Sequence, residues 1–322
     1  MQAQGHVAQN YSRTPPPAPS AALPWQLQMY QKSLKKRQKV ELLMRLMGQA
    51  GQAGSASAAR CLLISGHDNN GAMNYQFRAA GGQWSWGQVY PQGIPEMAEF
   101  LGDPVAHVDI ERFPFADAAF DVVIVIDVHE HFRKIDGLNR EIARIVAPGG
   151  LAIVTTPNGD TRLPVAALKR MVGMGPQAYG HVVQGYRIGE LESMLRFAGM
   201  EPVGSGGYAR FFTELAELVI NFAYVKVLAK KKEHPPAMQG TIAPTSKREL
   251  DAVRKEYRMY SLIYPFMYTF SLLDKLIPGR GGYAVAVSAR KPLQIGKPLQ
   301  DYDGLLGGRP TRRSHGVGGG LS

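Results

Sequence analysis

Short apolar runs and helical stripes of apolar residues alternate along the middle of the chain. The central runs are rich in Val and Ile, as is typical of strands buried on both faces of a parallel sheet. We predict strands at RCLLIS, QWSWGQVY, VAHVDI, DVVIVI, LAIVTT and EPVGSGGY. Helices are predicted between them, as in GLNREIARIV, where Leu138, Ile142 and Ile145 share one stripe. This alternation predicts βαβ units, and therefore an α/β fold with a parallel sheet and helices on both faces.

The alternation stops between residues 210 and 278, before a last strand predicted within GYAVAVSARKP. The first part of this segment has a polar helical stripe formed by Glu214, Glu217, Asn221 and Tyr224. The second part, residues 259–273, is uncharged, contains Pro265 and is too short to span a bilayer as a helix. We therefore predict a helical insertion before the final strand. Residues 259–273 are either a buried pair of core helices or an interfacial segment that touches a membrane.

The two ends of the chain differ from this core in composition. Residues 1–24 are rich in Pro, Ala, Gln and Ser, and residues 292–322 are rich in Gly and Arg, so both are predicted to be disordered tails. Residues 25–48 are predicted to form one basic amphipathic helix. A linker rich in Gly, Ala and Ser separates this helix from a predicted domain at residues 59–290.

Composition narrows the class of protein. The chain has 322 residues, of which 45% are hydrophobic, so it can bury a core. A net charge of +11 favours anionic partners, or it reflects a solvated basic surface. A single cysteine excludes a disulfide framework and a cysteine zinc site. The first residues lack a signal-peptide pattern, and we therefore expect a cytoplasmic protein.

Several motifs that would define a function are missing from the chain. The loop SGHDNNGAM has only Gly66 and Gly71 where a dinucleotide fold carries G-x-G-x-x-G. Neither the P-loop pattern nor the G-x-S-x-G elbow occurs, which argues against nucleotide hydrolysis and α/β-hydrolase chemistry. HEH at residues 129–131 does not match H-E-x-x-H, and histidines two apart share a face only on a strand. We therefore expect no metal site.

The segment DVHEH follows the strand DVVIVI directly. In open α/β sheets, ligands bind in the crevice beyond the carboxyl ends of the strands. We therefore expect Asp127, His129, Glu130 and His131 to lie where a ligand would bind.

One family has these features in the same order. HVDIERFPFADAAFDVVIVIDVHEHF, followed by LNREIARIVAPGGLAIVTTPN, resembles the class I S-adenosylmethionine-dependent methyltransferases, above all their small-molecule, type 11-like branch. The shared features are an acidic strand end, a Phe-Pro-Phe loop, FD, a strand that leads to EH, and PGG before the fifth strand. The resemblance covers about residues 60–208, and GYAVAVSARKP fits the family's antiparallel final strand. It implies a Rossmann-like fold and S-adenosyl-L-methionine as cofactor.

The resemblance also implies roles for particular residues. Asp109 and Ile110 would hold the adenine, and Asp127 would lie near the methionine part of the cofactor. Gly66 would let the backbone approach the cofactor closely. Two structural alternatives stay open: Asp109 as the cap of a strand-end turn, and Asp127 as a helix N-cap.

The first half of the family pattern diverges in this chain. Ile64 stands where the family has an acidic residue, and Asp68 replaces the second loop glycine. Gln88 and Val89 stand where an acidic residue would bind the ribose. Asp68 and Asn69 could supply replacement contacts, or the domain no longer binds the cofactor.

These observations predict methyl transfer to a small-molecule, lipid-like or lipid-linked glycan acceptor. For an oxygen acceptor, His129 or His131 could act as general base, and His181 is a further candidate. The aromatic insertion 210–278 and the basic N-terminal helix would contact the inner membrane face. The alternatives are a degenerate methyltransferase-fold scaffold at the membrane and a nucleic-acid methyltransferase. The second is disfavoured, because the basic residues do not follow an aromatic groove.

Overall fold

A computed structural model describes residues 23–49, 58–66, 69–223, 247–279 and 281–293. Most of both predicted tails, most of the linker, Asp68 and Tyr224 lie outside the described residues. The described residues form a seven-stranded sheet with the order β3-β2-β1-β4-β5-β7-β6. The strands are β1 (Arg60–Ser65), β2 (Gln83–Gln88), β3 (Val105–His107), β4 (Phe120–Ile126), β5 (Val146–Pro157), β6 (Glu201–Tyr208) and β7 (Ala284–Arg290). Neighbouring strands are parallel except at β7, which runs antiparallel to both β5 and β6. The predicted fold class, including the antiparallel final strand, is therefore confirmed.

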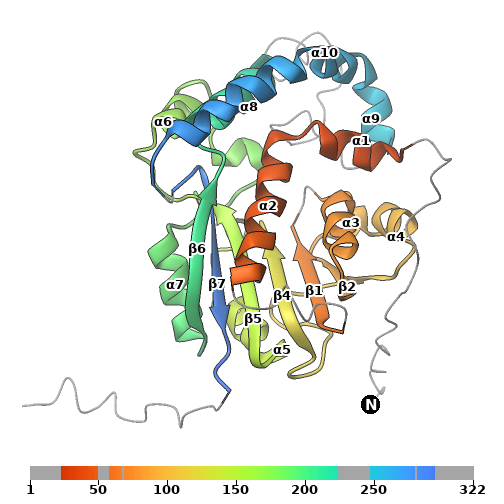
Figure 1. Cartoon of the computed structure of the whole chain (residues 1–322), viewed down its shortest axis with the longest axis vertical. Coiled ribbons are helices and arrows are strands. Elements are labelled where there is room, and N and C mark those ends of the chain that lie inside the picture. Colours follow the sequence, from red (N-terminus) through yellow and green to blue (C-terminus); the bar gives the residue numbers. More distant parts are fainter. Residues whose placement is uncertain (1–22, 50–57, 67–68, 224–246, 280, 294–322) are drawn as a thin grey trace, which may run out of the picture. The chain divides into compact units, whose positions relative to one another are not determined.

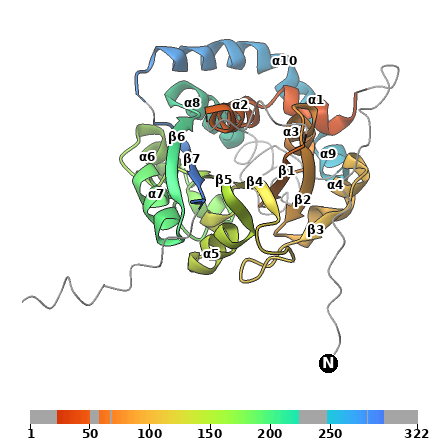
Figure 2. The ribbon, with the colours of Figure 1, turned by 60° about the horizontal axis from the view of Figure 1, so that its bottom comes forward.

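Helices cover both faces of the sheet (Figure 2). One core lies between the sheet and helices α5 (Asp136–Ile145) and α7 (Ile188–Phe197). A second core lies between the other face and helices α2 (Leu34–Gln49), α3 (Ala72–Ala79) and α4 (Ile94–Leu101). The central strands β1 and β4 contribute side chains to both cores, and this explains their continuous apolar sequences.

The predicted turn at APGG is part of strand β5 in the structure. Gly149 has a φ of 77°, a conformation that other residues rarely adopt. The pairing of β5 with β4 shifts register between Phe120 and Val122, opposite this segment. The strand therefore begins before the predicted LAIVTT, with an irregular first part.

The predicted single helix at residues 25–48 is wrong: two helices, α1 (Trp25–Gln31) and α2, occupy this stretch. The backbone N–H of Lys36 donates a hydrogen bond of 3.2 Å to Ser33 Oγ. This is an N-cap interaction, which favours the start of a new helix after Ser33. Charge and amphipathicity did not reveal the break, because the cap depends on local side-chain geometry.

Helix α2 is also part of the core and not an appendage to it (Figure 1). Leu42, Leu43 and Leu46 are buried against the sheet, and α2 contacts β5, β6 and β7. The compact part of the chain therefore begins before the predicted boundary at residue 59. The composition of the linker predicted a domain boundary at residue 59. Helix α2 lies before that boundary in the sequence but packs into the same core as the strands that follow it.

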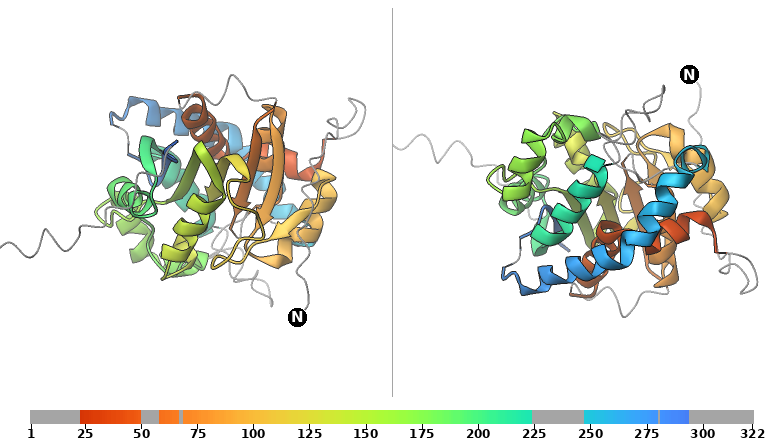
Figure 3. Two further views of the ribbon diagram at one scale, coloured as in Figure 1. Left: turned by 90° about the horizontal axis from the view of Figure 1, so that it is seen from below. Right: turned by 90° about the horizontal axis from the view of Figure 1, so that it is seen from above.

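The insertion forms helices α8 (Phe211–Phe222), α9 (Lys247–Ala252) and α10 (Arg254–Ser271). Figure 1 places α8 and α10 beyond the ends toward which β1, β4 and β5 point, and the view from above in Figure 3 shows them over the strands. The polar stripe of α8 faces inward, since Glu214 and Asn221 are buried.

The interpretation of residues 259–273 as a buried helix pair is wrong. Residues 259–271 belong to one helix, α10, with Pro265 inside it, and the last two residues of the segment begin the short helix η6 (Leu272–Leu276). Leu262 and Phe266 are each 76% exposed. Among the helices that the structure describes, none is long and apolar enough to cross a membrane.

Candidate functional site

The ends of β1 and β4 are in direct contact where a ligand was expected. The Gly66 N–H donates a hydrogen bond of 3.0 Å to the Ile126 carbonyl oxygen. A Cβ at Gly66 would lie 2.0 Å from the Asp127 carbonyl oxygen, so another residue would require the backbone to move. Asp127 itself has a left-handed φ of 50°. The structure thus brings two predicted site residues together, and Gly66 is needed for this close approach.

A lysine from the N-terminal segment reaches the same place. Lys39 on α2 is only 5% exposed and forms an ion pair with the Asp127 carboxylate. Asp127 is not a helix N-cap, because the residue at the N-cap of the short helix η2 (His129–His131) is Val128. Sequence reasoning missed Lys39 by treating it as part of a basic cluster. Its spacing to Leu42, Leu43 and Leu46 is i+3, i+4 and i+7, a signal that it shares their buried face.

Glu130 is a second buried carboxyl group at the exit of β4. It is 1% exposed, and Thr156 Oγ1 on β5 donates a hydrogen bond of 3.1 Å to its Oε2. Burial raises the pKa of Glu130 well above its ordinary value, and the neighbouring Asp127 carboxylate raises it further. The site therefore contains two carboxyl groups and one ammonium group in a poorly solvated environment.

The two histidines of HEH have different environments. His129 is completely buried, and its Nε2 lies 3.0 Å from Asn139 Oδ1. Burial lowers the pKa of His129 to about 4. A fully buried imidazole at the start of η2 is badly placed to meet an incoming acceptor, so the general-base hypothesis loses its geometric support at His129. At the half-buried His131 it stays a prediction.

The end of β3 places Asp109 on the surface and Ile110 half-buried beside it. Asp109 Oδ1 accepts a hydrogen bond of 3.0 Å from the Glu111 N–H. Asp109 therefore does cap a strand-end turn, and this leaves its exposed carboxylate able to meet a ligand as well. The adenine-binding role of Asp109 and Ile110 stays a prediction.

The loop after β1 holds a buried network of polar side chains. Ser65 Oγ donates a hydrogen bond of 2.6 Å to Gln88 Oε1. Asn69 Nδ2 donates to Ser65 Oγ at 3.0 Å and to Asn74 Oδ1 at 2.7 Å. Gln88 and Asn69 therefore bond to the protein itself, and Gln88 does not take over the exposed role of a ribose-binding carboxylate.

A further cluster of charges lies beneath α8. Lys35 Nζ lies 2.5 Å from Glu214 Oε2, and Lys169 on α6 (Pro164–Met171) forms an ion pair with the other oxygen of Glu214. Burial would raise the pKa of Glu214, but the two ammonium groups outweigh it and lower this pKa to about 2. The buried stripe of α8 is thus held by charged groups from α2 and α6.

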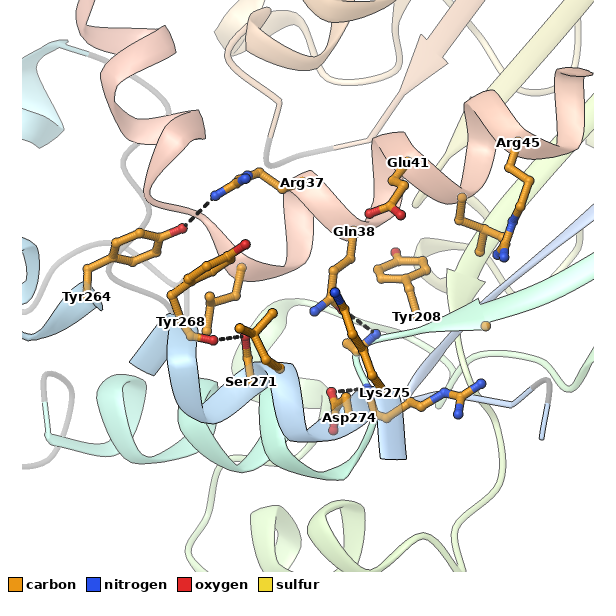
Figure 4. A pocket seen from close by; sticks show the side chains of 16 residues that line it. Arg37, Gln38, Glu41, Arg45, Tyr208, Tyr264, Tyr268, Ser271, Asp274 and Lys275 are labelled. Atoms are coloured by element: carbon orange, nitrogen blue, oxygen red, sulfur yellow. Dashed lines mark hydrogen bonds between the residues drawn. The ribbon is translucent and has the colours of Figure 1, made fainter. Parts of the chain in front are cut away.

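A groove of about 430 Å³ separates α2 from α10 (Figure 4). Arg37 and Arg45 line one side, and Tyr264 and Tyr268 line the other. Arg37 Nη1 donates a hydrogen bond of 3.1 Å to Tyr264 Oη, and its guanidinium carbon lies 5.3 Å from the centre of the Tyr268 ring. Tyr208 also lines the groove, and Lys39 Nζ lies 5.9 Å from the centre of the Tyr208 ring. One residue thus contacts both the groove and the buried lysine of the strand-end site.

Comparison with known proteins agrees with the sheet order, in which an antiparallel β7 lies between β5 and β6 as in class I methyltransferases. Residues 90–154 match the family model described as "Methyltransferase domain". No curated protein matches the chain in sequence. The chain has the class I methyltransferase fold, and the matched domain supports S-adenosylmethionine-dependent methyl transfer, as the sequence predicted.

Solved structures with a similar chain path include three methyltransferases. One is an S-adenosylmethionine-dependent methyltransferase from Mesorhizobium loti, with 11% identity, a TM-score of 0.45, and coverage of 76% of this chain and 95% of that one. A second, from Thermotoga maritima, has 14% identity, a TM-score of 0.46, and coverage of 82% and 93%. The third is the N-methyltransferase NodS from Bradyrhizobium japonicum, in complex with S-adenosyl-L-homocysteine. It has 18% identity, a TM-score of 0.44, and coverage of 59% and 87%.

The residues at the strand ends fit one part of S-adenosylmethionine better than another. Lys39 and Asp127 offer an ammonium and a carboxylate group, which are complementary to the carboxylate and ammonium groups at the methionine end. Asp109 offers an exposed carboxylate for the adenine amine. At the ribose position, Gln88 is bonded to Ser65 and no carboxylate stands at the end of β2. The donor set therefore fits the two ends of the cofactor and departs from the family at its centre.

Proposed function

We propose that this protein transfers the methyl group of S-adenosylmethionine to a lipid-like or lipid-linked acceptor presented at a membrane surface. The main support for this class of acceptor is the exposed apolar face of α10, which lies beside the groove lined by Arg37, Arg45 and tyrosines. The methyl transfer itself is supported by the match of residues 90–154 to a methyltransferase domain.

The cofactor would be held by three parts of the chain. Lys39 would pair with its methionine carboxylate, and Asp127 would accept from its ammonium group. Asp109 would accept from the adenine amine, with Ile110 beside it. The Gly66 backbone brings the β1 and β4 exits together at this point, as its contact with Asp127 indicates.

The bound cofactor supplies an electrophilic methyl group on a positively charged sulfur. The protein's contribution to such an in-line displacement is chiefly positioning, which is worth up to about 7–11 kcal/mol when the reactants are well oriented. The side chains of Lys39 and Glu130 are themselves shielded from water. The charged groups at the β4 exit therefore act on a bound ligand with little screening.

The exposed stripe of α10 supports a lipid surface as the site of action. Met259, Leu262, Ile263 and Phe266 are between 43% and 76% exposed on this helix. Exposed Lys255 and Arg258 precede or flank the stripe on the same helix. An apolar face bordered by basic residues is the composition that binds anionic membranes in the plane of the interface.

The groove between α2 and α10 supports an acceptor with an anionic group. Two guanidinium groups in a groove suit a phosphate or carboxylate, because Arg forms bidentate hydrogen bonds to both. Tyr264 and Tyr268 of the groove belong to α10, the helix that carries the apolar stripe, so a head group in the groove and a lipid chain on the stripe would lie on adjoining surfaces.

Two binding measurements on the full chain test the proposed function. In calorimetry, we expect S-adenosylmethionine to bind, and Asp109→Ala to weaken binding at least tenfold, with Asp136→Ala on α5 as the matched control. In flotation with vesicles of phosphatidylcholine and phosphatidylglycerol, we expect the protein to float with the vesicles and Phe266→Ser to abolish this. Phe197→Ser is the matched control, because Phe197 is 86% exposed on α7, away from the stripe.

The two measurements separate the alternatives. Vesicle binding by a folded protein that does not bind S-adenosylmethionine would contradict methyl transfer and favour the membrane scaffold. Cofactor binding without vesicle binding would contradict the lipid-surface acceptor. Equal loss of flotation in Phe197→Ser and Phe266→Ser would show that the α10 stripe has no special role.

A further inference from the structure

Glu130, His131 and His181 gather at the exit of β4. Each offers one metal-ligand atom, and the three atoms lie within 4.8 Å of one another. We propose that these three side chains form a binding site for a divalent transition-metal ion. The expectation of no metal site considered only His129 and His131, and the structure replaces His129 with a histidine from a distant loop.

The backbone fixes the loop that carries His181 beside Glu130. The amide groups of Val182 and Val183 both donate to the Glu130 carbonyl oxygen, at 2.9 Å and 3.1 Å. These two hydrogen bonds tie the residues that follow His181 directly to η2. The proximity of His181 to Glu130 is therefore a property of the fold and not of flexible side chains.

His131 has the hydrogen bond that is typical of a metal-binding imidazole. Its Nδ1 lies 3.2 Å from the Gly180 carbonyl oxygen. A carbonyl oxygen can only accept, so Nδ1 is the protonated nitrogen and Nε2 carries the lone pair. Metal-binding histidines usually donate their second ring N–H to a carbonyl or carboxylate group in this way. The ring centre of His181 lies 5.2 Å from that of His131.

Glu130 is oriented as well. The hydrogen bond from Thr156 Oγ1 to its Oε2 holds the carboxyl group, which is buried beside the Asp127 carboxylate. Two neighbouring carboxyl groups in a poorly solvated place favour the binding of a cation. Lys39 pairs with Asp127, so the Glu130 carboxyl group is the one left to bind a metal ion, whose positive charge would hold it as a carboxylate.

The donor set indicates the class of metal. Two imidazoles and one carboxylate suit first-row ions such as Mn²⁺, Fe²⁺, Co²⁺ or Zn²⁺, whereas Mg²⁺ and Ca²⁺ prefer oxygen ligands. Three protein ligands leave coordination positions for a substrate. The site is thus of the kind that binds substrate oxygen, and not a closed structural site.

The position of the ion at the β4 exit deepens the proposed function and rests on it: the acceptor would be a hydroxyl group. A hydroxyl oxygen that binds the cation loses its proton more readily. That proton passes to water, and the oxygen forms its bond to the methyl carbon while the carbon–sulfur bond breaks. The bonding pair stays on sulfur, which becomes a neutral thioether.

Cobalt binding tests the site without reference to activity. The untagged full chain is dialysed against EDTA and titrated with Co²⁺, and the visible absorption of the ion is followed. We expect one equivalent to bind with visible bands, and His181→Ala to weaken binding at least tenfold. His107→Ala is the matched control, because His107 is an exposed histidine at the end of β3, outside the cluster.

The melting temperature of each variant is measured, so that only folded proteins are compared. Glu130→Gln is a second variant of the metal site and is nearly isosteric with the wild type. No Co²⁺ binding by the wild type, or equal binding in His181→Ala, would overturn the metal site. Calorimetry with S-adenosylmethionine is run on the same samples. Co²⁺ binding without cofactor binding would overturn the proposed methyl transfer while leaving the metal site in place.

Discussion

Most proteins bury apolar side chains and expose charged ones. The carboxyl end of β4 and the helix α10 both depart from this rule, in opposite ways. At the β4 exit, charged groups are buried: Lys39 is 5% exposed and Glu130 is 1% exposed. On α10, large apolar side chains are exposed, with Leu262 and Phe266 at 76%. Buried charges are rare in proteins unless they are paired, and clustered exposed apolar groups often mark a binding surface.

The two regions therefore have different effects on the free energy of folding. Burying charge costs stability in the folded protein and is offset by pairing. Exposing an apolar face costs little folding stability, because the unfolded chain exposes it too. Substitutions should therefore affect stability strongly at the β4 exit and weakly on α10.

The largest effect is expected for Lys39→Met. It would leave the Asp127 and Glu130 carboxyl groups without their ammonium partner. Breaking a buried pair by removing one partner costs about 3–5 kcal/mol. Urea unfolding measures this loss, and S-adenosylmethionine affinity should fall at least tenfold in calorimetry.

The matched control is Lys134→Met, at an exposed position just before α5. Its effect on the free energy of unfolding should stay within about 0.5 kcal/mol. Equal stability of Lys39→Met and the wild type would contradict a structural role for the ion pair.

An intermediate effect is expected from acid at the cluster beneath α8. The folded-state pKa of Glu214 is about 2, below its ordinary value of 4.5. Its contribution to stability is therefore fully present above pH 4.5 and is lost as the pH falls towards 2. The size is on the order of 3 kcal/mol, since each pKa unit corresponds to about 1.4 kcal/mol.

Urea unfolding between pH 5 and pH 2.5 checks this expectation. Glu214→Gln should remove the steep part of the decline, while Glu99→Gln, at an exposed position on α4, should leave it unchanged. Parallel pH profiles for the wild type and Glu214→Gln would mean that Glu214 is not the responsible group.

The smallest effect is expected for Leu262→Ala on the exposed face of α10. Its free energy of unfolding should change by less than about 0.5 kcal/mol. Leu43→Ala is the matched control, because Leu43 on α2 is 0% exposed and its truncation should cost about 2–5 kcal/mol. A large destabilisation by Leu262→Ala would indicate that the helix packs against the protein and is no free surface.

Much of the fold could be predicted because it depends on local patterns. The side chains of the apolar run at Val122–Ile126 point alternately to both faces of a strand. They can all be buried only if helices cover both faces of the sheet, and β4 lies between two such layers. The last strand and its antiparallel direction followed from the resemblance to methyltransferases, and β7 confirms them. The break at Ser33 was missed, because a single cap bond decides it.

The candidate site could be predicted only in part. Gly66, Asp109 and Asp127 follow strands, and a strand end fixes the position of the next residue in the sheet. Lys39 was missed, and His181 was named only as a further candidate base. They come from a helix and a loop far away in the sequence, and their approach depends on how those segments pack.

The sequence by itself determined the layers, the order of strands and helices, and which edge of the sheet carries polar residues. These features depend on the spacing of apolar residues within each segment, which can be read from the sequence of that segment alone. The tertiary structure alone decided that Lys39 is buried, that His131 meets His181 and not His129, and that the apolar face of α10 is exposed. Partners of this kind are chosen by packing between distant segments, and no local pattern in either segment specifies the other.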